Sequence, residues 1–144
     1  MVRRTTVAVS GGFDPVHSGH ISLFREAKKL GDRLVVILNN DHWLKKKKGY
    51  VFMPQKDREA VLRAIRYVDD VKVTAHPKNS DDISVCQILK RLRPNIFANG
   101  GDRLPSNIPE YDLCEKLGIK MVFKVGGEKA QSSSELVRQV RSRK

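Results

Sequence analysis

The strongest constraint on the fold of this chain is a regular alternation between short apolar runs and longer amphipathic segments. The apolar runs have the length of β-strands, and the amphipathic segments repeat apolar residues at helical spacing. Strands are expected at residues 5–10, 33–39, 71–74, 95–99 and 120–125, and helices at 18–31, 54–68, 82–92, 109–118 and 132–142. This alternation predicts an α/β fold, a five-stranded parallel sheet with helices on both faces.

The length and composition favour a single domain over residues 1–144. A chain of this length can bury one hydrophobic core, and its sequence contains no repeat, linker or low-complexity tract. No apolar run approaches the roughly 20 residues of a membrane span. Cys86 and Cys114 both lie in apolar helical patterns, which favours buried thiols over a disulfide framework or a metal cluster. We therefore expect a cytoplasmic protein that does not enter a membrane.

The charge balance favours an anionic partner. The chain has 28 lysines and arginines against 16 acidic residues, a net charge of +12. Such an excess suits a polynucleotide, a nucleotide or a phosphorylated metabolite. The basic residues are scattered, and aromatic residues make up only 6% of the chain, so there is no stacking array for nucleic-acid bases. A basic nucleic-acid-binding domain is therefore an alternative that the sequence disfavours.

The most unusual segment is SGGFDPVHSGH at residues 10–20, between the first expected strand and the first expected helix. Gly11 and Gly12 permit a sharp turn and a close approach of a ligand to the backbone. The unpaired N–H groups and the dipole of the following helix favour an anion at its N-terminus. His17 and His20 are three residues apart and can project from the same side of that helix. The segment predicts a site for a phosphate group whose charge grows during reaction.

This segment resembles the motif Gly-x-Phe-Asp-x-x-His-x-Gly-His of the cytidylyltransferase-like nucleotidyltransferases. The resemblance extends over nearly the whole chain and includes the segments LGDRLVVILNND, KKKKGY, REAVLRAIRYVDDV, FANGGDR and SSSELV. It implies a Rossmann-like domain, a homodimer, and Mg²⁺ as cofactor. The implied reaction transfers a nucleoside monophosphate from CTP or ATP to the phosphate of a small metabolite, such as glycerol phosphate or a sugar phosphate, and releases pyrophosphate. Adenylyl transfer to a flavin or pantetheine phosphate is the alternative within the family.

The resemblance, together with the positions of these residues near strand ends, implies roles for individual residues. The expected catalytic residues are His17, His20 and Lys48. The expected nucleotide-binding residues are Gly11, Gly12, Phe13, Gly19, Asn99, Gly101, Asp102, Ser132, Ser133 and Ser134. The expected contacts to the acceptor substrate are Asp41, Lys45 and Arg58.

Several of these residues have a structural alternative. Asp14 is expected either to hold Mg²⁺ or to cap the turn with its side chain. The lysine block at 45–48 is either a flexible clamp on phosphates or a solvated loop. Arg58 either contacts an anion or forms a surface salt bridge, and Trp43 either lines the acceptor pocket or packs against the protein.

The sequence leaves the base of the nucleotide open. Many cytidylyltransferases carry Arg-Thr-x-Gly before the serine-threonine run, whereas the stretch here is GEKAQSSS. Lys129 could supply a point charge there, but not the planar bidentate grip of arginine. The missing arginine and the Gly-Gly-Asp turn resemble the heptose-1-phosphate adenylyltransferases and favour ATP. The segment RYVDDV is similar to cytidylyltransferases and favours CTP.

Overall fold

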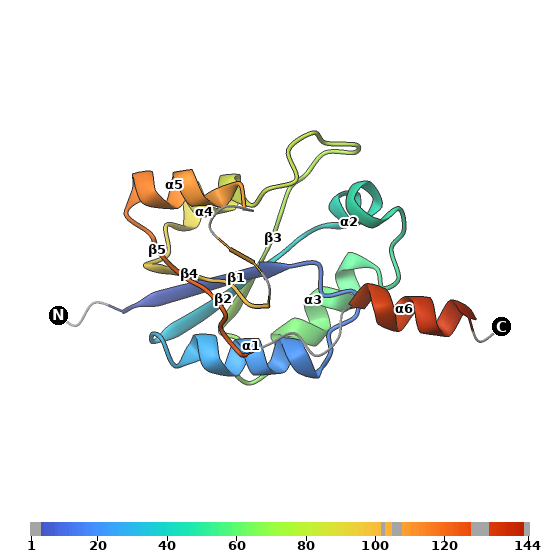
Figure 1. The fold of residues 1–144 in the computed structure, drawn as a ribbon, viewed down its shortest axis with the longest axis horizontal. Helices are drawn as coiled ribbons and strands as arrows, with labels where there is room; N and C mark the ends of the chain where they lie inside the picture. Colours follow the sequence, from blue (N-terminus) through green and yellow to red (C-terminus); the bar gives the residue numbers. More distant parts are fainter. Residues whose placement is uncertain (1–3, 102, 105–107, 128–132, 143–144) are drawn as a thin grey trace.

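The computed structural model describes residues 4–101, 103–104, 108–127 and 133–142 (Figure 1). The strands are β1 (Thr6–Gly11), β2 (Arg33–Leu38), β3 (Asp70–Val73), β4 (Ile96–Ala98) and β5 (Lys120–Val122). The helices are α1 (Ser18–Lys28), α2 (Asp41–Lys48), α3 (Gln55–Arg63), α4 (Cys86–Leu92), α5 (Glu110–Leu117) and α6 (Ser133–Ser142). The alternation expected from the sequence is present, with one additional helix.

The five strands form one parallel sheet in the order β3-β2-β1-β4-β5. The chain adds β2 and β3 on one side of β1 and then β4 and β5 on the other. The connections after β1 and β4 therefore leave the sheet in opposite directions, and a crevice opens between them at the carboxyl ends of the strands. The predicted fold class is confirmed.

Both faces of the sheet are buried by helices. Val7 and Val9 belong to the apolar cluster that includes residues of α1 and α3, whereas Ala8 belongs to the cluster that includes residues of α4 and α5. Figure 1 shows these two helix pairs on opposite faces of the sheet. Because successive side chains of a strand point to opposite faces, a strand covered on both sides must be apolar throughout. This explains the continuous apolar runs in the sequence.

Helix α2 corrects the expectation of a loop at the lysine block. Asn40 caps its N-terminus, with Oδ1 accepting the N–H of Trp43 at 3.0 Å. Gly49 ends it in the left-handed conformation (φ 85°) and donates its N–H to the carbonyl of Lys45. Residues 45–48 thus form the last turn, where the helix dipole favours positive charge.

The expectation of buried cysteines is confirmed for one of the two. Cys114 is buried in the cluster beneath α4 and α5, and Cys86 is half-buried. Burial raises the pKa of the Cys114 thiol to about 11, so it stays protonated at neutral pH. Within the described ranges, no helix has the length and apolar character needed to cross a membrane.

Candidate active site

A pocket that is open to solvent lies at the carboxyl ends of β1 and β4, where the strand order reverses. It contains a large part of the predicted nucleotide-binding and catalytic set: Gly11, Phe13, His17, Gly19, His20, Asn99 and Gly101. Gly100, which follows the expected fourth strand, also lines the pocket, as its position at the strand end predicts. The lining residues that were not predicted are Ser10, Leu23, Ala98, Arg103, Val125, Gly126 and Gly127. The segments after β1, β4 and β5 therefore form one pocket.

The two histidines are fixed at the N-terminus of α1 by reciprocal backbone contacts. His17 is the N-cap, and its Nδ1 accepts the N–H of Gly19 at 3.1 Å. His20 Nδ1 accepts the N–H of His17 at 3.1 Å, and the two rings stack with centroids 3.9 Å apart. A neutral imidazole that accepts through Nδ1 carries its proton on Nε2. Each ring therefore carries its N–H at Nε2, on the side away from the backbone, and Nε2 of His17 is buried. An imidazole N–H is the kind of donor that a phosphate oxygen accepts.

Two glycines of this turn make room for protein side chains. A Cβ on Gly11 would lie 2.9 Å from the ring of Phe13, and a Cβ on Gly19 would lie 2.9 Å from the ring of His17. Phe13 is buried at a positive φ of 50°, with its ring edge-on to His20 at 4.9 Å between centroids. The turn is therefore packed around the histidines, and the glycines are required for that packing.

The segment between β5 and α6 closes one side of the pocket. Gly126 has a φ of 86°, and a Cβ there would lie 2.9 Å from the backbone of Leu23 in α1. Ser22 Oγ donates to the carbonyl of Gly126 at 3.0 Å. The signal that could have identified this wall is the Gly-Gly pair, Gly126 and Gly127, directly after the last expected strand.

Asn99 offers a buried acceptor in the pocket wall. Its side chain is 2% exposed, and its Nδ2 donates to the carbonyl of Phe97 at 3.3 Å. Because that carbonyl can only accept, the amide orientation is fixed and Oδ1 faces away from it. Oδ1 has no hydrogen-bond partner among the described residues. A buried acceptor without a partner is unfavourable, so this position suits an N–H or O–H group of a ligand.

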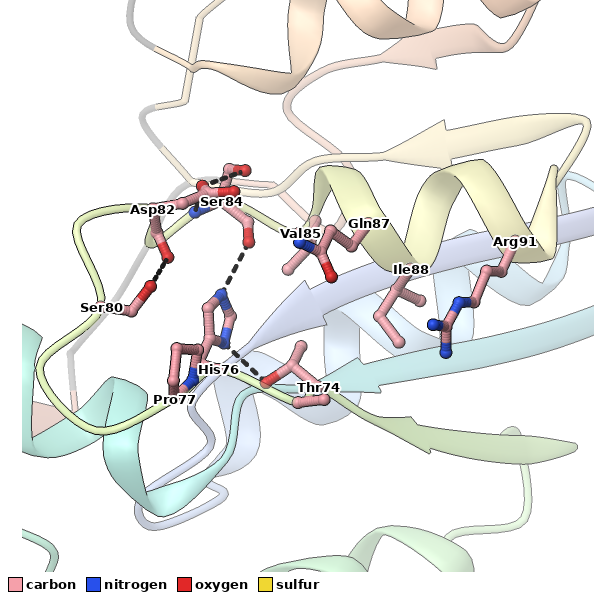
Figure 2. Close-up of a pocket in the computed structure, with 11 residues that line it drawn as sticks. Thr74, His76, Pro77, Ser80, Asp82, Ser84, Val85, Gln87, Ile88 and Arg91 are labelled. Atoms are coloured by element: carbon pink, nitrogen blue, oxygen red, sulfur yellow. Dashed lines mark hydrogen bonds between the residues drawn. The ribbon is translucent and has the colours of Figure 1, made fainter.

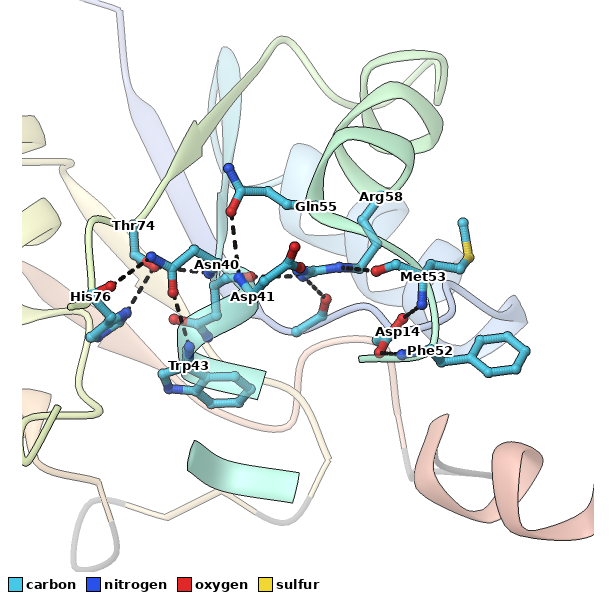
Figure 3. Close-up of polar contacts among 12 residues, drawn as sticks. Asp14, Asn40, Asp41, Trp43, Phe52, Met53, Gln55, Arg58, Thr74 and His76 are labelled. Atoms are coloured by element: carbon cyan, nitrogen blue, oxygen red, sulfur yellow. Dashed lines mark hydrogen bonds and ion pairs between the residues drawn. The ribbon is translucent and has the colours of Figure 1, made fainter. Parts of the chain in front are cut away.

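Arg58 does not fit the expected contact with substrate. Its side chain is 0% exposed. Nε donates to the carbonyl of Met53 at 2.9 Å, and Nη1 donates to the carbonyls of Gly12 and Asn39 at 2.8 and 2.7 Å. Nη2 donates to Asp41 Oδ1 at 2.6 Å (Figure 3). The guanidinium therefore joins three backbone segments, and the expectation of a substrate-facing or surface position is corrected.

Asp14 acts as a cap on backbone N–H groups. It is 0% exposed, and its two carboxylate oxygens accept the N–H groups of Phe52 and Met53 (Figure 3). This corrects the reading of Asp14 as a metal ligand, because a carboxylate held in this way has no open face for a cation. Among the described residues, no group of three or more His, Cys, Asp or Glu side chains could hold a metal. Asp14 thus caps the segment before α3, and not its own turn as the alternative expected.

Helix α2 stands apart from the pocket lining. Lys45 is exposed and Lys48 is half-buried. Trp43 Nε1 donates to the carbonyl of Ile83 at 2.7 Å, and a Cβ on Gly12 would lie 3.1 Å from the Trp43 ring. Trp43 thus packs α2 between the β1–α1 turn and the segment before α4. Asp41, Lys45 and Lys48 lie outside the pocket lining.

Two of the predicted nucleotide-binding residues, Asp102 and Ser132, lie outside the described residues. Ser133 and Ser134 begin helix α6, but their side chains also lie outside what the structure describes. Their proposed phosphate contacts stay predictions.

A second pocket lies between the end of β3 and α4 (Figure 2). His76 Nε2 donates to the carbonyl of Ser84 at 2.8 Å, so Nδ1 accepts the Thr74 hydroxyl at 2.8 Å. Thr74 Oγ1 in turn accepts the N–H of Asn40 at 3.0 Å. These hydrogen bonds connect the segment between β3 and α4 to the start of α2, which gives His76 a structural role.

The chain matches the family model described as cytidylyltransferase-like over residues 8–140. It is 41% identical over 120 residues to an FAD synthase of Pyrococcus horikoshii, which covers 83% of this chain and 73% of that protein. It is 38% identical over 121 residues to the bifunctional protein HldE of Streptomyces coelicolor, covering 83% of this chain but only 25% of that protein. The crystal structure of a lipopolysaccharide core biosynthesis protein from Thermoplasma volcanium superposes with a TM-score of 0.67 at 26% identity, covering 85% of this chain and 97% of the other.

Proposed function

Since this chain belongs to the cytidylyltransferase-like family of nucleotidyltransferases, we propose that it transfers AMP from ATP to the phosphate of flavin mononucleotide. The observation that carries the proposal is the pair His17 and His20 at the N-terminus of α1, inside the pocket at the strand-order reversal. The FAD synthase relative, matched over most of its length, supports both ATP and the flavin acceptor. The missing arginine before Ser132 also favours ATP over CTP.

The reaction requires positioning and charge stabilisation. An oxygen of the acceptor phosphate attacks the α-phosphorus of ATP, the bond from that phosphorus to the bridging oxygen breaks, and pyrophosphate leaves. No covalent enzyme intermediate is needed. The Nε2–H groups of His17 and His20 donate to phosphate oxygens whose negative charge grows in the transition state. The N-terminus of α1 adds its dipole at the same place.

Other residues complete the proposed site. Asn99 Oδ1 would accept the exocyclic amino group of adenine or a ribose hydroxyl, which gives this buried acceptor a partner. Lys48, in the last turn of α2, would bind the acceptor or leaving phosphates as a point charge. Mg²⁺ stays a prediction. Both carboxylate oxygens of Asp14 accept backbone N–H groups, so Asp14 is not proposed as a ligand of the ion. The ion would instead enter the site bound to the phosphates of the nucleotide, as Mg²⁺ commonly does.

A sugar phosphate is the second candidate acceptor. The HldE relative and the fold of the lipopolysaccharide core biosynthesis protein favour it. The attacking group would again be a phosphate oxygen, so the same histidines would serve both reactions. A homodimer stays a proposal for either case.

The test is a matrix of donors and acceptors. Purified protein with Mg²⁺ is incubated with ATP or CTP and with flavin mononucleotide, a sugar 1-phosphate or glycerol 3-phosphate, and pyrophosphate release is measured. We expect release with ATP and flavin mononucleotide, together with FAD in the chromatogram. Release with ATP only when the sugar phosphate is present would move the conclusion to the second candidate. Release only with CTP would overturn the assignment of the donor.

A further inference from the structure

Glu110 is a buried acid behind the wall of the nucleotide pocket. It is 3% exposed and begins helix α5. Its Oε1 accepts the N–H of Val85 at 3.1 Å, and its Oε2 lies 3.4 Å from Nη2 of Arg103. A buried carboxylate is unfavourable unless it is hydrogen-bonded and paired with a cation. The Val85 contact satisfies one oxygen, and the other is directed at Arg103.

Arg103 joins this buried acid to the pocket. Its side chain is one-third exposed and lines the pocket. Nη1 lies 3.4 Å from the hydroxyl oxygen of Ser10, at the end of β1. Each terminal nitrogen of a guanidinium carries two N–H groups, so contacts to Ser10 and Glu110 leave further donors on the same planar group. The side chain is thus held at two points while keeping donors for a ligand.

The position of Arg103 complements the histidines. Ser10 is two residues after Ala8 and points to the same face of β1, the face covered by α4 and α5. His17 and His20 belong to α1, which covers the opposite face. The pocket therefore has nitrogen donors on both walls, and a ligand with several phosphates could contact both walls at once.

We propose that Arg103 binds the triphosphate of the nucleotide and that Glu110 is the positioning residue that holds its guanidinium in place. The inference rests on the proposed function. It assigns to the β4–α5 segment the arginine that is missing before the serine run. The planar guanidinium can bind two phosphate oxygens at once, which a lysine cannot do. The 3.4 Å contacts would shorten when the nucleotide is bound, as hydrogen bonds at active sites commonly do.

The first measurement is binding of ATP, AMP, CTP and CMP to wild-type protein and to Arg103→Ala by calorimetry. For the triphosphate that the wild type binds, Arg103→Ala should weaken binding about 10- to 100-fold, the usual effect of losing a hydrogen bond between two charged groups. Binding of the matching monophosphate should change less than about 3-fold. Arg91→Ala, which removes an exposed arginine outside this pocket, is the matched control and should change neither.

The second measurement isolates Glu110. Glu110→Gln keeps an oxygen for the N–H of Val85 but presents an amide, without charge, to Arg103. The variant should fold normally and raise the KM for the triphosphate several-fold with little change in kcat. Because Glu110 acts through Arg103, the double variant should bind no more weakly than Arg103→Ala alone.

The outcomes separate the two proposals. If the wild type binds none of the nucleotides, the proposed function fails. If it binds a triphosphate and Arg103→Ala binds equally well, only this inference fails. Equal losses for triphosphate and monophosphate would exclude a contact to the terminal phosphates. Additive losses in the double variant would overturn the positioning role of Glu110.

Discussion

Two regions carry cationic or polar residues of the family motifs, yet they use them in opposite ways. One is the turn that begins α1. The other, here called the junction, is residues 49–58, which link α2 to α3 and include the first turn of α3. In the α1 turn, the backbone donates to the Nδ1 atoms of His17 and His20, and the Nε2–H donors stay on the far side of the rings. In the junction, the side chain of Arg58 donates to three backbone carbonyls and to Asp41. In the α1 turn, the ring nitrogens that contact the backbone are acceptors, whereas in the junction the N–H donors of the guanidinium bind the protein itself.

The difference shows that a charge near a phosphate site is not by itself a phosphate contact. Arg58 reaches the carbonyl of Gly12, in the same turn that carries the histidines. Asp14, from that turn, accepts the N–H groups of Phe52 and Met53 just before α3. The junction therefore stabilises the turn through these hydrogen bonds. We expect changes in the junction to act on stability and changes in the α1 turn to act on rate.

The largest expected effect is on stability, from Arg58→Ala. Removing the guanidinium leaves the carbonyls of Met53, Gly12 and Asn39 without this donor. The free energy of unfolding should fall by about 3–5 kcal/mol, because each unsatisfied buried group costs about 1–3 kcal/mol. Urea unfolding measures this. The exposed Arg25→Ala is the control and should change stability by less than about 0.5 kcal/mol. If Arg58→Ala is as stable as the wild type and has a raised KM for the acceptor, the result would favour a contact between Arg58 and the substrate.

Changes in the histidine turn should lower the rate of turnover and leave the free energy of unfolding nearly unchanged. His17→Asn keeps a side-chain acceptor at the N-cap but removes the imidazole, so α1 should retain its stability. Steady-state turnover should fall by about 10²–10³, as when one donor to a developing oxyanion is lost. His20→Ala should lower turnover similarly. Full turnover in either variant, with native unfolding curves, would contradict the mechanism.

The sequence predicted what depends on periodicity and on strand ends. The alternation of elements predicted the parallel sheet, because a strand that is buried on both faces must be apolar at every position. The carboxyl ends of parallel strands meet at one edge, which brought Gly11 and Asn99 into one pocket as expected. Helix α2 was missed because four lysines suggest a solvated loop. Asn40 and Gly49 are nevertheless ordinary cap residues and were the available signal.

The hydrogen-bond partners of the buried polar side chains could not be predicted from the sequence. Arg58 lies in a helix with few apolar residues, and nothing in the spacing indicates that the carbonyls of residues 12, 39 and 53 converge on it. The same holds for Arg103 and Glu110, which are separated by residues that carry no recognisable pattern. Such contacts depend on how loops from several strands meet, and local periodicity does not encode that.

A smaller effect distinguishes the two readings of Asp14. Asp14→Asn replaces one of two accepting oxygens by an NH₂ group, which cannot accept the N–H of Phe52 or Met53. The free energy of unfolding should fall by about 1–3 kcal/mol, the cost of one unsatisfied buried group. The concentration of Mg²⁺ that gives half-maximal activity should stay at the wild-type value. A large rise in that concentration would return Asp14 to the metal site.

The smallest expected effect separates two lysines on the same helix turn. Lys46 donates to Asn79 Oδ1 at 3.1 Å on the exposed surface, whereas Lys48 is half-buried at the end of α2. Each alanine variant removes one charge from the last turn of α2. In both variants, the weaker interaction with the helix dipole should lower the free energy of unfolding by roughly 0.3–1 kcal/mol. Any difference in steady-state kinetics therefore reports on ligand contact. Lys48→Ala should raise the KM for acceptor or nucleotide by about 10-fold, the effect of one charge-assisted contact near the lower end of its range. Lys46→Ala should leave KM nearly unchanged, and equal KM values for the two variants would mean that α2 serves the site through its fold alone.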